Sequence, residues 1–518
     1  MASFMQTLVG ANQIPIKDKI RYAIGTMPIE LMYAVFYTYF MIFLTDVAGM
    51  PAVTAGVIAG AAAFVDGAVD PFLGAWSDYK YKKDGTRKTA MRIGVYPLAS
   101  VAVLLFVPLG LTGVTQIIYY AIISMIFVTM YSMYAINYSS IPGEITTDYS
   151  ERNTIRLIMS LLTPVCAWIS TAGLQIVKTV TPNASDASQW MIFGVILSGI
   201  AIVAVLIFFG MVPSRKQVAA GQLKGVFAHQ KEVMQANAAA AADEEDVRVD
   251  VIKNLKEVLS LKALRCTIAM VLSFSLGNGF RYSLIAYALT YTAALSSAQQ
   301  AAFWSITNIT NYIVLFVSVA IVNLIGSRRL VFIIAFGLTA LNSFFHYFMG
   351  LDTFGSILIF GIIFIFIETP FWAMWINISF DIADLDEFVF GKRRTALISS
   401  INMFMVKIGP TIALITTGAI LAACGYVEGG VDQTPETAIA IGKWLTGLNG
   451  IFFGIGALSF IGYKINRKNN DALNTALENR KTGKPYSIDG FRDILPKWFV
   501  EKFDEEHPDG VATPQEQV

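Results

Sequence analysis

Twelve apolar stretches of about 20 residues constrain this chain more than any other feature of its sequence. A helix that crosses the hydrocarbon layer of a bilayer needs about 20 apolar residues, because each residue advances the helix by about 1.5 Å. Six such stretches begin near residues 22, 52, 93, 116, 153 and 190, and six more begin near residues 264, 301, 330, 355, 395 and 443. Hydrophobic residues make up 55% of the chain and charged residues 14%, which is more apolar surface than a soluble domain can bury. The sequence therefore predicts an all-α membrane protein with two groups of six transmembrane helices.

A polar, Ala-rich and acidic segment at residues 235–246 separates the two groups of apolar stretches. It predicts a cytoplasmic central loop between two six-helix bundles. Residues 491–503 of the polar tail have the apolar spacing of an amphipathic helix that meets lipid or the bundles. The predicted parts are an N-terminus at 1–21, a bundle at 22–213, the central loop at 214–262, a second bundle at 263–465 and a tail at 466–518.

Lysine and arginine gather in every second short loop, as at residues 80–88 and 392–394, whereas the opposite loops carry Asp46, Asp186 and Glu428. Because cytoplasmic loops are enriched in basic residues, both termini are predicted to face the cytoplasm. No removable signal peptide is evident near the N-terminus. We therefore expect a multi-pass plasma-membrane protein, with a bacterial inner membrane favoured.

The composition disfavours several classes of function. A formal charge of +1 gives no basic field to attract nucleic acid. The cysteines Cys166, Cys266 and Cys424 do not have metal or redox spacing, and the chain contains no HExxH, GxSxG or phosphate-binding loop motif. We expect free thiols, no enzyme activity, and a monomer whose partners are a small solute and membrane lipid.

Three carboxylates lie inside predicted spans of the first group, where an ionised group costs about 2.5–3.5 kcal/mol and must face protein or water. Glu30 lies in the first span, and Asp66 and Asp70 lie one helical turn apart in the second. Two carboxylates on one helix face cannot both ionise cheaply unless a cation lies between them or one keeps its proton. The pair therefore indicates a cation or proton switch. The alternative is that the aspartates pair with basic residues of other helices or lie in a cytoplasmic vestibule.

The second group of spans carries four further polar side chains of interest. Lys407 is predicted either to neutralise the aspartates across a cavity or to pair with Glu368. Arg281 is predicted to bind an anionic substrate through paired hydrogen bonds, to pair with Glu368, or to extend its charged end toward the membrane surface. Trp372 lies at a similar depth, where an indole that faces a polar cavity stacks on a sugar ring. Ordinary packing is the alternative for Trp372.

Several motifs together resemble one transporter family. They are TDVAG at 45–49, FVDGAVDP at 64–71, GAWSDYKYKKDGTRK at 74–88, IPGEITTDYSERN at 141–153 and DIADLDEFVFGKRR at 381–394. In these residues the chain resembles the glycoside-pentoside-hexuronide:cation symporter family of the major facilitator superfamily. The likeness extends over about residues 21–467. It implies the major facilitator fold, with two six-helix bundles around a central cavity.

The resemblance also implies roles for the matched residues. Asp66 and Asp70 would ligate the coupling ion, which is Na⁺, Li⁺ or H⁺ in the family, and Na⁺ would make them metal ligands. Glu30, Trp372 and Lys407 would lie at the solute site. The cytoplasmic loops would gate the cavity through Asp78, Arg87, Arg152, Asp384 and Arg393.

Three residues depart from the pattern of melibiose permease, a member of that family. Ala135 stands where the pattern has a third cation and sugar aspartate, Ser139 where it has a sugar-stacking tryptophan, and Ser160 where it has a sugar-binding arginine. Recognition of a galactoside by that pattern is therefore not expected. Asn137 is predicted to supply a neutral oxygen to the cation, since hard cations accept amide oxygens.

These observations lead us to expect cation-coupled symport of a sugar, glycoside or hexuronide by alternating access. Na⁺ or H⁺ would be the coupling ion, with no other cofactor. One alternative is cation-coupled transport of an amphiphile such as a lysolipid, or of another organic anion. The other is a non-transporting membrane sensor or scaffold that binds a partner through its tail.

Overall fold

The computed structural model describes residues 14–146, 148–223, 225–227, 230, 232, 251–325 and 327–512. Within these ranges the regular structure is helical, apart from one isolated bridge between Tyr486 and Ala512. Twelve helical segments of the described chain are long and apolar enough to cross a membrane. The predicted all-α fold with twelve transmembrane helices is therefore confirmed.

The first bundle contains the first six spans. Its helices are α2 (Ile16–Ile24) continued by α3 (Met27–Ile42) and the π-turn η1 (Phe43–Val47), then α4 (Ala52–Asp84), α5 (Lys88–Leu105), α6 (Gly113–Ser140), α8 (Tyr149–Val180) and α9 (Asp186–Phe209). The short helices α7 (Pro142–Ile145) and α10 (Arg215–Ala219) lie in its connecting loops.

The first span begins at Ile16, earlier than the predicted start near residue 22, and it breaks at Gly25. Gly25 packs so closely against two aromatic rings that an added Cβ would lie 2.7 Å from each. Lys19 lies inside this early segment and lowers the mean hydropathy of the segment, so hydropathy did not indicate that the span begins there. The structure buries its ammonium group 2.7 Å from the carboxylate of Glu151 in α8.

The second bundle contains the other six spans. Its helices are α13 (Lys262–Tyr287) continued by η4 (Ala288–Thr292), then α14 (Ser297–Ile325), α15 (Arg328–Met349), α16 (Phe354–Phe390), α17 (Thr395–Ala423) and α18 (Pro435–Ile461). Helix α12 (Val251–Ser260), from the predicted central loop, is attached to this bundle because Arg394 contacts both Glu257 of α12 and Asp386 of α16.

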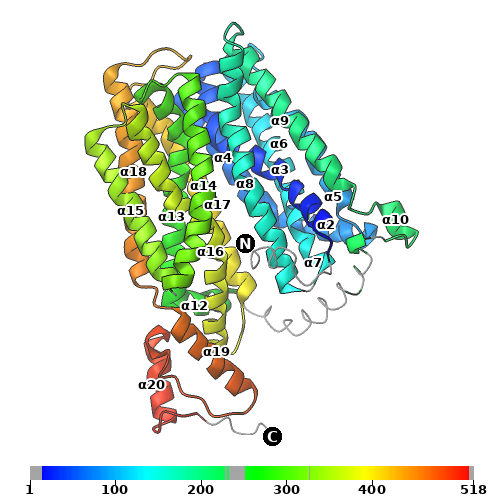
Figure 1. The fold of residues 1–518 in the computed structure, drawn as a ribbon, viewed down its shortest axis with the longest axis vertical. Helices are drawn as coiled ribbons and strands as arrows, with labels where there is room; N and C mark the ends of the chain where they lie inside the picture. Colours follow the sequence, from blue (N-terminus) through cyan, green and yellow to red (C-terminus); the bar gives the residue numbers. More distant parts are fainter. Residues whose placement is uncertain are drawn as a thin grey trace.

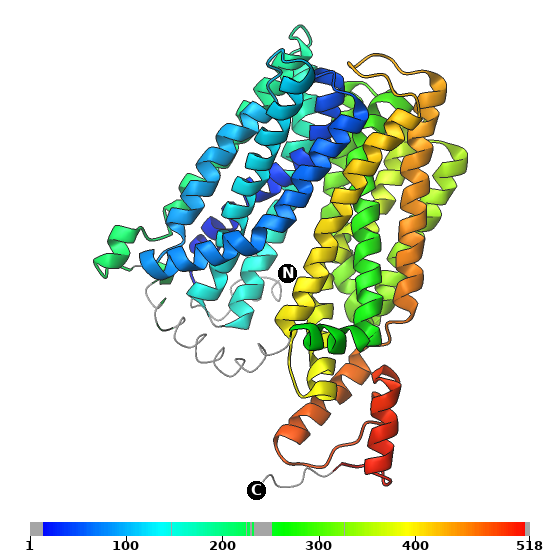
Figure 2. The same ribbon diagram turned by 180° about the vertical axis from the view of Figure 1, so that it is seen from behind.

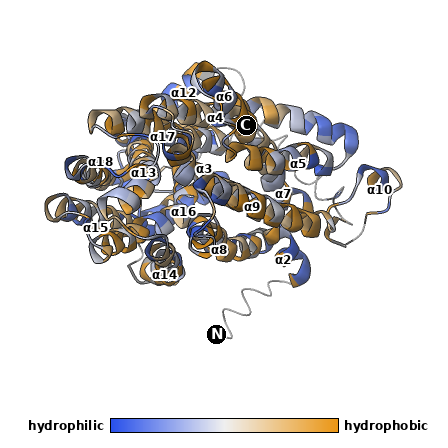
Figure 3. Cartoon of the chain, turned by 90° about the horizontal axis from the view of Figure 1, so that it is seen from above, coloured by the Kyte–Doolittle hydropathy of each residue, from blue (hydrophilic) through white to orange (hydrophobic). Residues whose placement is uncertain are grey.

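The two bundles lie side by side, approach each other at one end and diverge toward the other (Figure 1, Figure 2). Among the described residues, the most extensive contacts between them are those of α4 with α17, α8 with α14, and α3 with α13. Small residues allow α4 and α17 to touch, since a Cβ on Gly418 would lie 2.5 Å from the carbonyl oxygen of Ala52. From above, the long helices are mainly hydrophobic, as spans in lipid require, whereas short segments such as α2 and α10 are more hydrophilic (Figure 3).

The tail packs against the end of α16 at the end of the molecule where the bundles diverge, which we call the tail end. It consists of α19 (Arg467–Lys481), the short η5 (Arg492–Ile494) and α20 (Lys497–Glu506). The ring of Phe388 at the end of α16 meets Phe491 at 5.0 Å and Phe499 at 5.7 Å between centroids. The amphipathic segment was predicted to meet lipid or the bundles, and these ring contacts join it to α16 of the second bundle. Its helix begins only at Lys497.

Candidate functional site

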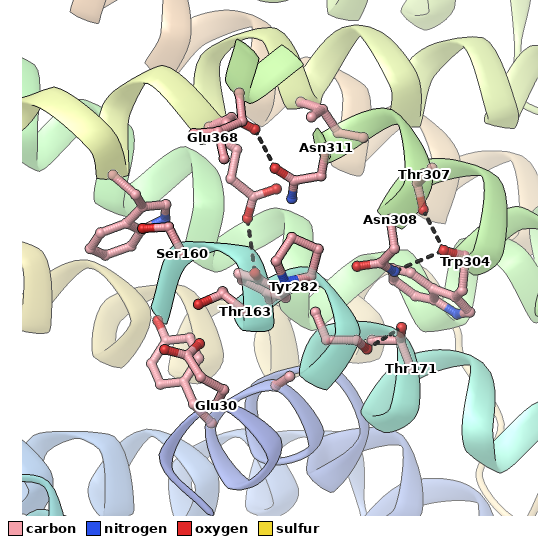
Figure 4. Close-up of a pocket in the computed structure, with 18 of the residues that line it drawn as sticks. Glu30, Ser160, Thr163, Thr171, Tyr282, Trp304, Thr307, Asn308, Asn311 and Glu368 are labelled. Atoms are coloured by element: carbon pink, nitrogen blue, oxygen red, sulfur yellow. Dashed lines mark hydrogen bonds between the residues drawn. The ribbon is translucent and has the colours of Figure 1, made fainter. Parts of the chain in front are cut away.

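A cavity of about 390 Å³ lies between the two bundles (Figure 4). Helices α3, α6 and α8 line it from the first bundle, and α13, α14 and α16 line it from the second. Its volume falls within the range of about 300–1,000 Å³ that is usual for small-molecule sites. The polar and aromatic groups of its wall include Glu30, Ser160, Arg281, Asn308, Glu368 and Trp372.

Arg281 and Glu368 form an ion pair in the wall of the cavity that belongs to the second bundle. Arg281 Nη1 and Glu368 Oε2 are 3.8 Å apart. The guanidinium carbon also lies 4.0 Å from the centroid of the Phe364 ring, and the hydroxyl of Tyr282 donates to Glu368 Oε1 at 2.9 Å. Of the alternatives predicted for Arg281, the structure shows the pairing with Glu368. The guanidinium charge is therefore balanced within the protein.

Glu30 and Trp372 face the same cavity from opposite bundles. The Glu30 carboxyl group extends from α3 toward α8, within hydrogen-bonding reach of Thr163 (Figure 4). Trp372 of α16 lines the cavity with 41% of its surface exposed, and its ring meets Phe274 edge to face at 5.9 Å. A carboxylate that accepts hydroxyl protons, together with an exposed indole face, is a suitable pair for holding a sugar ring.

A second polar cluster lies where α4 packs against α17. Lys407 Nζ lies 2.5 Å from Asp70 Oδ2 and 3.1 Å from Asp66 Oδ2. The hydroxyl of Ser132 in α6 donates to Asp66 Oδ1 at 2.6 Å. Of the alternatives predicted for Lys407, the structure shows pairing with the two aspartates and not with Glu368. Two carboxylates and one ammonium carry one net negative charge when all three are ionised.

One oxygen of this cluster lacks a partner, since Asp70 Oδ1 is buried without a hydrogen bond from any described residue. A buried carboxylate oxygen without a donor costs about 1–3 kcal/mol or more. The carboxylate and hydroxyl oxygens of Asp66, Asp70 and Ser132 are the type of ligand that a hard cation prefers. The cluster therefore fits one monovalent cation or one proton.

Asn137 does not join the aspartate pair, so its predicted role as a cation ligand is wrong for this structure. Its Oδ1 accepts a hydrogen bond from Ser77 at 2.5 Å, and its Nδ2 donates to the carbonyl oxygen of Met133 at 2.7 Å. Ser77 lies 11 residues after Asp66 on α4, or about 16 Å along the helix. The residue of α6 that reaches Asp66 is Ser132, more than one turn earlier.

The predicted gating residues form ion pairs within each bundle at the tail end. Asp78 and Arg87 of the first bundle pair at 2.9 Å, and Asp384 and Arg393 of the second pair at 2.8 Å. The side chain of Arg152 lies outside the described residues. Among the described side chains, none of these pairs crosses from one bundle to the other.

At the end opposite the tail, hydrogen bonds do cross between the bundles. Asp46 accepts from the hydroxyl groups of Tyr291, at 2.6 Å, and Tyr426. The hydroxyl of Thr45 lies 2.9 Å from that of Tyr287. Burial raises the pKa of Tyr426 and the nearby Asp46 raises it further, so the Tyr426 hydroxyl stays protonated and donates. We call these five residues the polar lock, because they close this end while the tail end diverges.

The model of the MFS/sugar transport protein family matches residues 21–467 of the chain. The chain belongs to this family. Its members are transporters, so the expectation that the chain is not an enzyme is confirmed, as is its place in the membrane as a multi-pass protein. The twelve apolar helices and the cavity between two bundles are what a membrane transporter of this family requires.

Similar proteins match almost the whole chain. The chain is 25% identical to the isoprimeverose transporter of Lactiplantibacillus pentosus over 89% of this chain and 91% of that protein. It is 24% identical to an inner membrane symporter of Escherichia coli (strain K12) over 91% and 96% of the two chains. The crystal structure of a D-xylose-proton symporter superposes with a TM-score of 0.59 at 13% identity, over 87% and 98% of the two chains. The resemblance to glycoside and cation symporters of the major facilitator superfamily is confirmed.

Two groups of site residues were not predicted from the sequence. Ser132 was missed because a serine in an apolar helix carries no signal of its own, and only its contact with Asp66 reveals it. The amides of Asn308 and Asn311 on α14 were also missed, although both face the cavity. Their signal is present in the sequence, since ITNITN at residues 306–311 places four polar side chains inside a predicted span.

Proposed function

We propose that the chain is a symporter that moves a sugar or glycoside together with one monovalent cation, Na⁺ or H⁺, by alternating access. The observation that carries this proposal is the cluster of Asp66, Asp70 and Lys407, whose net charge is −1 and whose members come from both bundles. A charge in this low-dielectric region is costly, so the cluster favours taking up one positive charge. One added cation or proton makes it neutral.

The cluster also provides a physical link between the cation and the movement of the bundles. Asp66 and Asp70 lie on α4 of the first bundle, whereas Lys407 lies on α17 of the second. The ammonium and an incoming cation compete for the same carboxylate oxygens, so cation binding weakens an ion pair that joins the bundles. A ligand that changes the free energy of one bundle arrangement relative to another shifts the equilibrium between them, and the coupling is reciprocal.

The solute occupies the adjacent cavity, where Glu30 accepts hydrogen bonds from its hydroxyl groups and Trp372 stacks on a ring. Arg281 contributes by fixing Glu368 and does not bind a solute carboxylate directly. A polar cavity with three charged side chains favours a hydroxylated solute over an amphiphile. The isoprimeverose transporter among the relatives supports a glycoside as the solute.

The tail end faces the cytoplasm in this proposal, because the basic loops gather there, as at residues 80–88 and 392–394. The bundles diverge at this end and are joined by the polar lock at the other (Figure 1). The structure then corresponds to the inward-facing state of the cycle. Transport requires the polar lock to open while the pairs of Asp78 with Arg87 and Asp384 with Arg393 approach each other. We place the protein, as a monomer, in a bacterial inner membrane.

The test is uptake by proteoliposomes that contain the purified full-length protein. Radiolabelled isoprimeverose and a panel of other glycosides are offered with a Na⁺ gradient, a pH gradient or neither. We expect accumulation above the external concentration with one of the two gradients, and only equilibration without them. Binding of sugars without flux in sealed vesicles would support the scaffold alternative and contradict the proposal.

A further inference from the structure

Helix α14 presents a polar face to the cavity that no role assigned so far explains. Trp304, Thr307, Asn308, Asn311 and Leu315 all line the cavity, and their spacing of three, four, seven and eleven residues keeps them on one face of the helix. An asparagine inside a membrane span is costly unless it has partners, and such residues usually mark a solute pathway or interhelical contact.

Asn308 keeps one hydrogen-bonding group available for a solute. Its Nδ2 donates to the carbonyl oxygen of Trp304 at 2.8 Å, and its Oδ1 accepts from no described residue. Across the cavity on α8, the Thr171 hydroxyl donates to the carbonyl oxygen of Ala167 at 2.7 Å, which leaves its lone pairs as acceptors. Both groups therefore offer acceptors to a hydroxyl group, and the indole of Trp304 lies beside them (Figure 4).

The amide end of the cavity is distinct from the end that holds Glu30 and Trp372. Ser160 and Thr171 both line the cavity, and their separation of 11 positions corresponds to about 16 Å along α8. Opposite hydroxyl groups of a single pyranose ring are separated by five bonds of about 1.5 Å each, so one ring covers less than about 8 Å. The cavity is therefore long enough for two sugar units in line.

Charge also distinguishes the two ends. The charged side chains among the residues that line the cavity are Glu30, Arg281 and Glu368, and the positive one is already paired with Glu368. Arg156, one turn before Ser160 on α8, is exposed and is not part of the lining. The wall around Asn308 and Thr171 consists of uncharged groups. A carboxylate on the solute would find no free cation there, and Glu30 would repel it.

We propose that Asn308, Thr171 and Trp304 form a second subsite that receives an uncharged, hydroxyl-bearing unit of the solute. This inference rests on the proposed function, which supplies the first subsite at Glu30 and Trp372. The substrate is then a neutral disaccharide or a glycoside with a hydroxylated second unit, and neither a monosaccharide nor a uronate. Asn308 and Thr171 determine this length preference.

The test compares Asn308→Leu and Thr171→Val with the wild type and with Thr310→Val, a control on α14 whose side chain does not line the cavity. Binding of cellobiose, lactose, maltose and xylobiose to the purified full-length protein is measured by thermal shift, beside glucose, galactose, xylose and cellobiouronate. The wild type is expected to bind its preferred disaccharide at least tenfold more tightly than the component monosaccharides and the uronate. Loss of one neutral hydrogen bond weakens binding by about three- to tenfold.

In Asn308→Leu and Thr171→Val the disaccharide preference is expected to fall to within threefold, while monosaccharide affinity stays within twofold of the wild type. Thr310→Val is expected to keep the full preference. Unchanged preference in both cavity variants, or monosaccharides that bind the wild type as tightly as any disaccharide, would overturn the second subsite. In that case cation-driven uptake of the monosaccharides would leave the proposed function intact. Absence of cation-driven uptake for every sugar would contradict the proposed function and the subsite together.

Discussion

Replacing Lys407 with methionine tests the charge balance of the cation cluster. The ammonium lies 2.5 Å from one oxygen of Asp70 and 3.1 Å from one of Asp66, so it balances one of the two negative charges. Lys407→Met keeps the length of the side chain but changes the net charge of the cluster from −1 to −2. We expect a protein that is less stable without the coupling cation and that binds this cation more tightly.

The size of the effect follows from the burial of the ion pair. Removing one partner of a buried pair costs about 3–5 kcal/mol, and the lower figure applies because Lys407 and Asp70 keep 25% and 29% of their side-chain surface exposed. At about 1.36 kcal/mol per factor of ten, about 3 kcal/mol corresponds to about 150-fold in apparent cation affinity. A cation at about 100 times its Kd returns about 2.7 kcal/mol of stability, so saturation should restore most of the loss.

Thermal unfolding of the purified protein, followed across a Na⁺ titration and a pH titration, measures this change. The matched control is Lys443→Met, which removes a lysine from α18 that forms no ion pair with any described residue. We expect the variant at Lys407 to unfold at a lower temperature without cation and to gain more stability from it than the wild type. A variant that is as stable as the wild type and responds equally to both titrations would refute the assigned charge balance.

Two further substitutions test one contact between the bundles and one within the first bundle. Gly418→Val places a side chain against backbone atoms of α4, so we expect it to prevent closure at the polar lock and to abolish transport. The reporter is a cysteine at Ser160 in a background without native cysteines. With Gly418→Val added, this cysteine should react more slowly with an impermeant thiol reagent from the tail side than it does without that substitution. An unchanged labelling rate would contradict the expectation. Lys19→Ala leaves the buried carboxylate of Glu151 uncompensated, so we expect a loss of about 3–5 kcal/mol in unfolding free energy. The exposed Lys17→Ala is its control, and equal unfolding temperatures for the two variants would contradict the buried pair.

Much of the fold could be predicted from the sequence, because lipid imposes a minimum apolar length on every span. The starts of α4, α14 and α17 fall within a few residues of the predicted positions. The first and last spans begin earlier than predicted, at Ile16 instead of near residue 22 and at Pro435 instead of near residue 443. In the first span, Lys19 and its neighbours made α2 resemble a polar terminus. Burial of Lys19 depends on Glu151, 132 residues later, and no local pattern contains that pairing.

The site was less accessible to sequence reasoning, for a related reason. Asp66 and Asp70 could be singled out because paired carboxylates in a span are costly and therefore conspicuous. The partner of Lys407 was left open between the aspartates and Glu368, since helix depth does not fix which faces of α4, α16 and α17 meet. Asn137 was predicted as a ligand by its place in the sequence, but the rotation of α6 turns it toward Ser77.

The central claim is that one positive charge moves with each molecule of solute, because the cluster of Asp66, Asp70 and Lys407 lacks one charge. The most direct test measures tracer sugar uptake and charge movement in the same proteoliposomes. A potential of 100 mV is worth about 2.3 kcal/mol per charge, which supports about 50-fold accumulation of a neutral sugar. We predict one charge per sugar and this accumulation in the wild type. We predict equilibration without charge movement in Asp70→Asn, with Asp352→Asn, an exposed aspartate outside the spans, as a wild-type-like control. Sugar that moves without charge in the wild type, or accumulates in Asp70→Asn, would contradict the account.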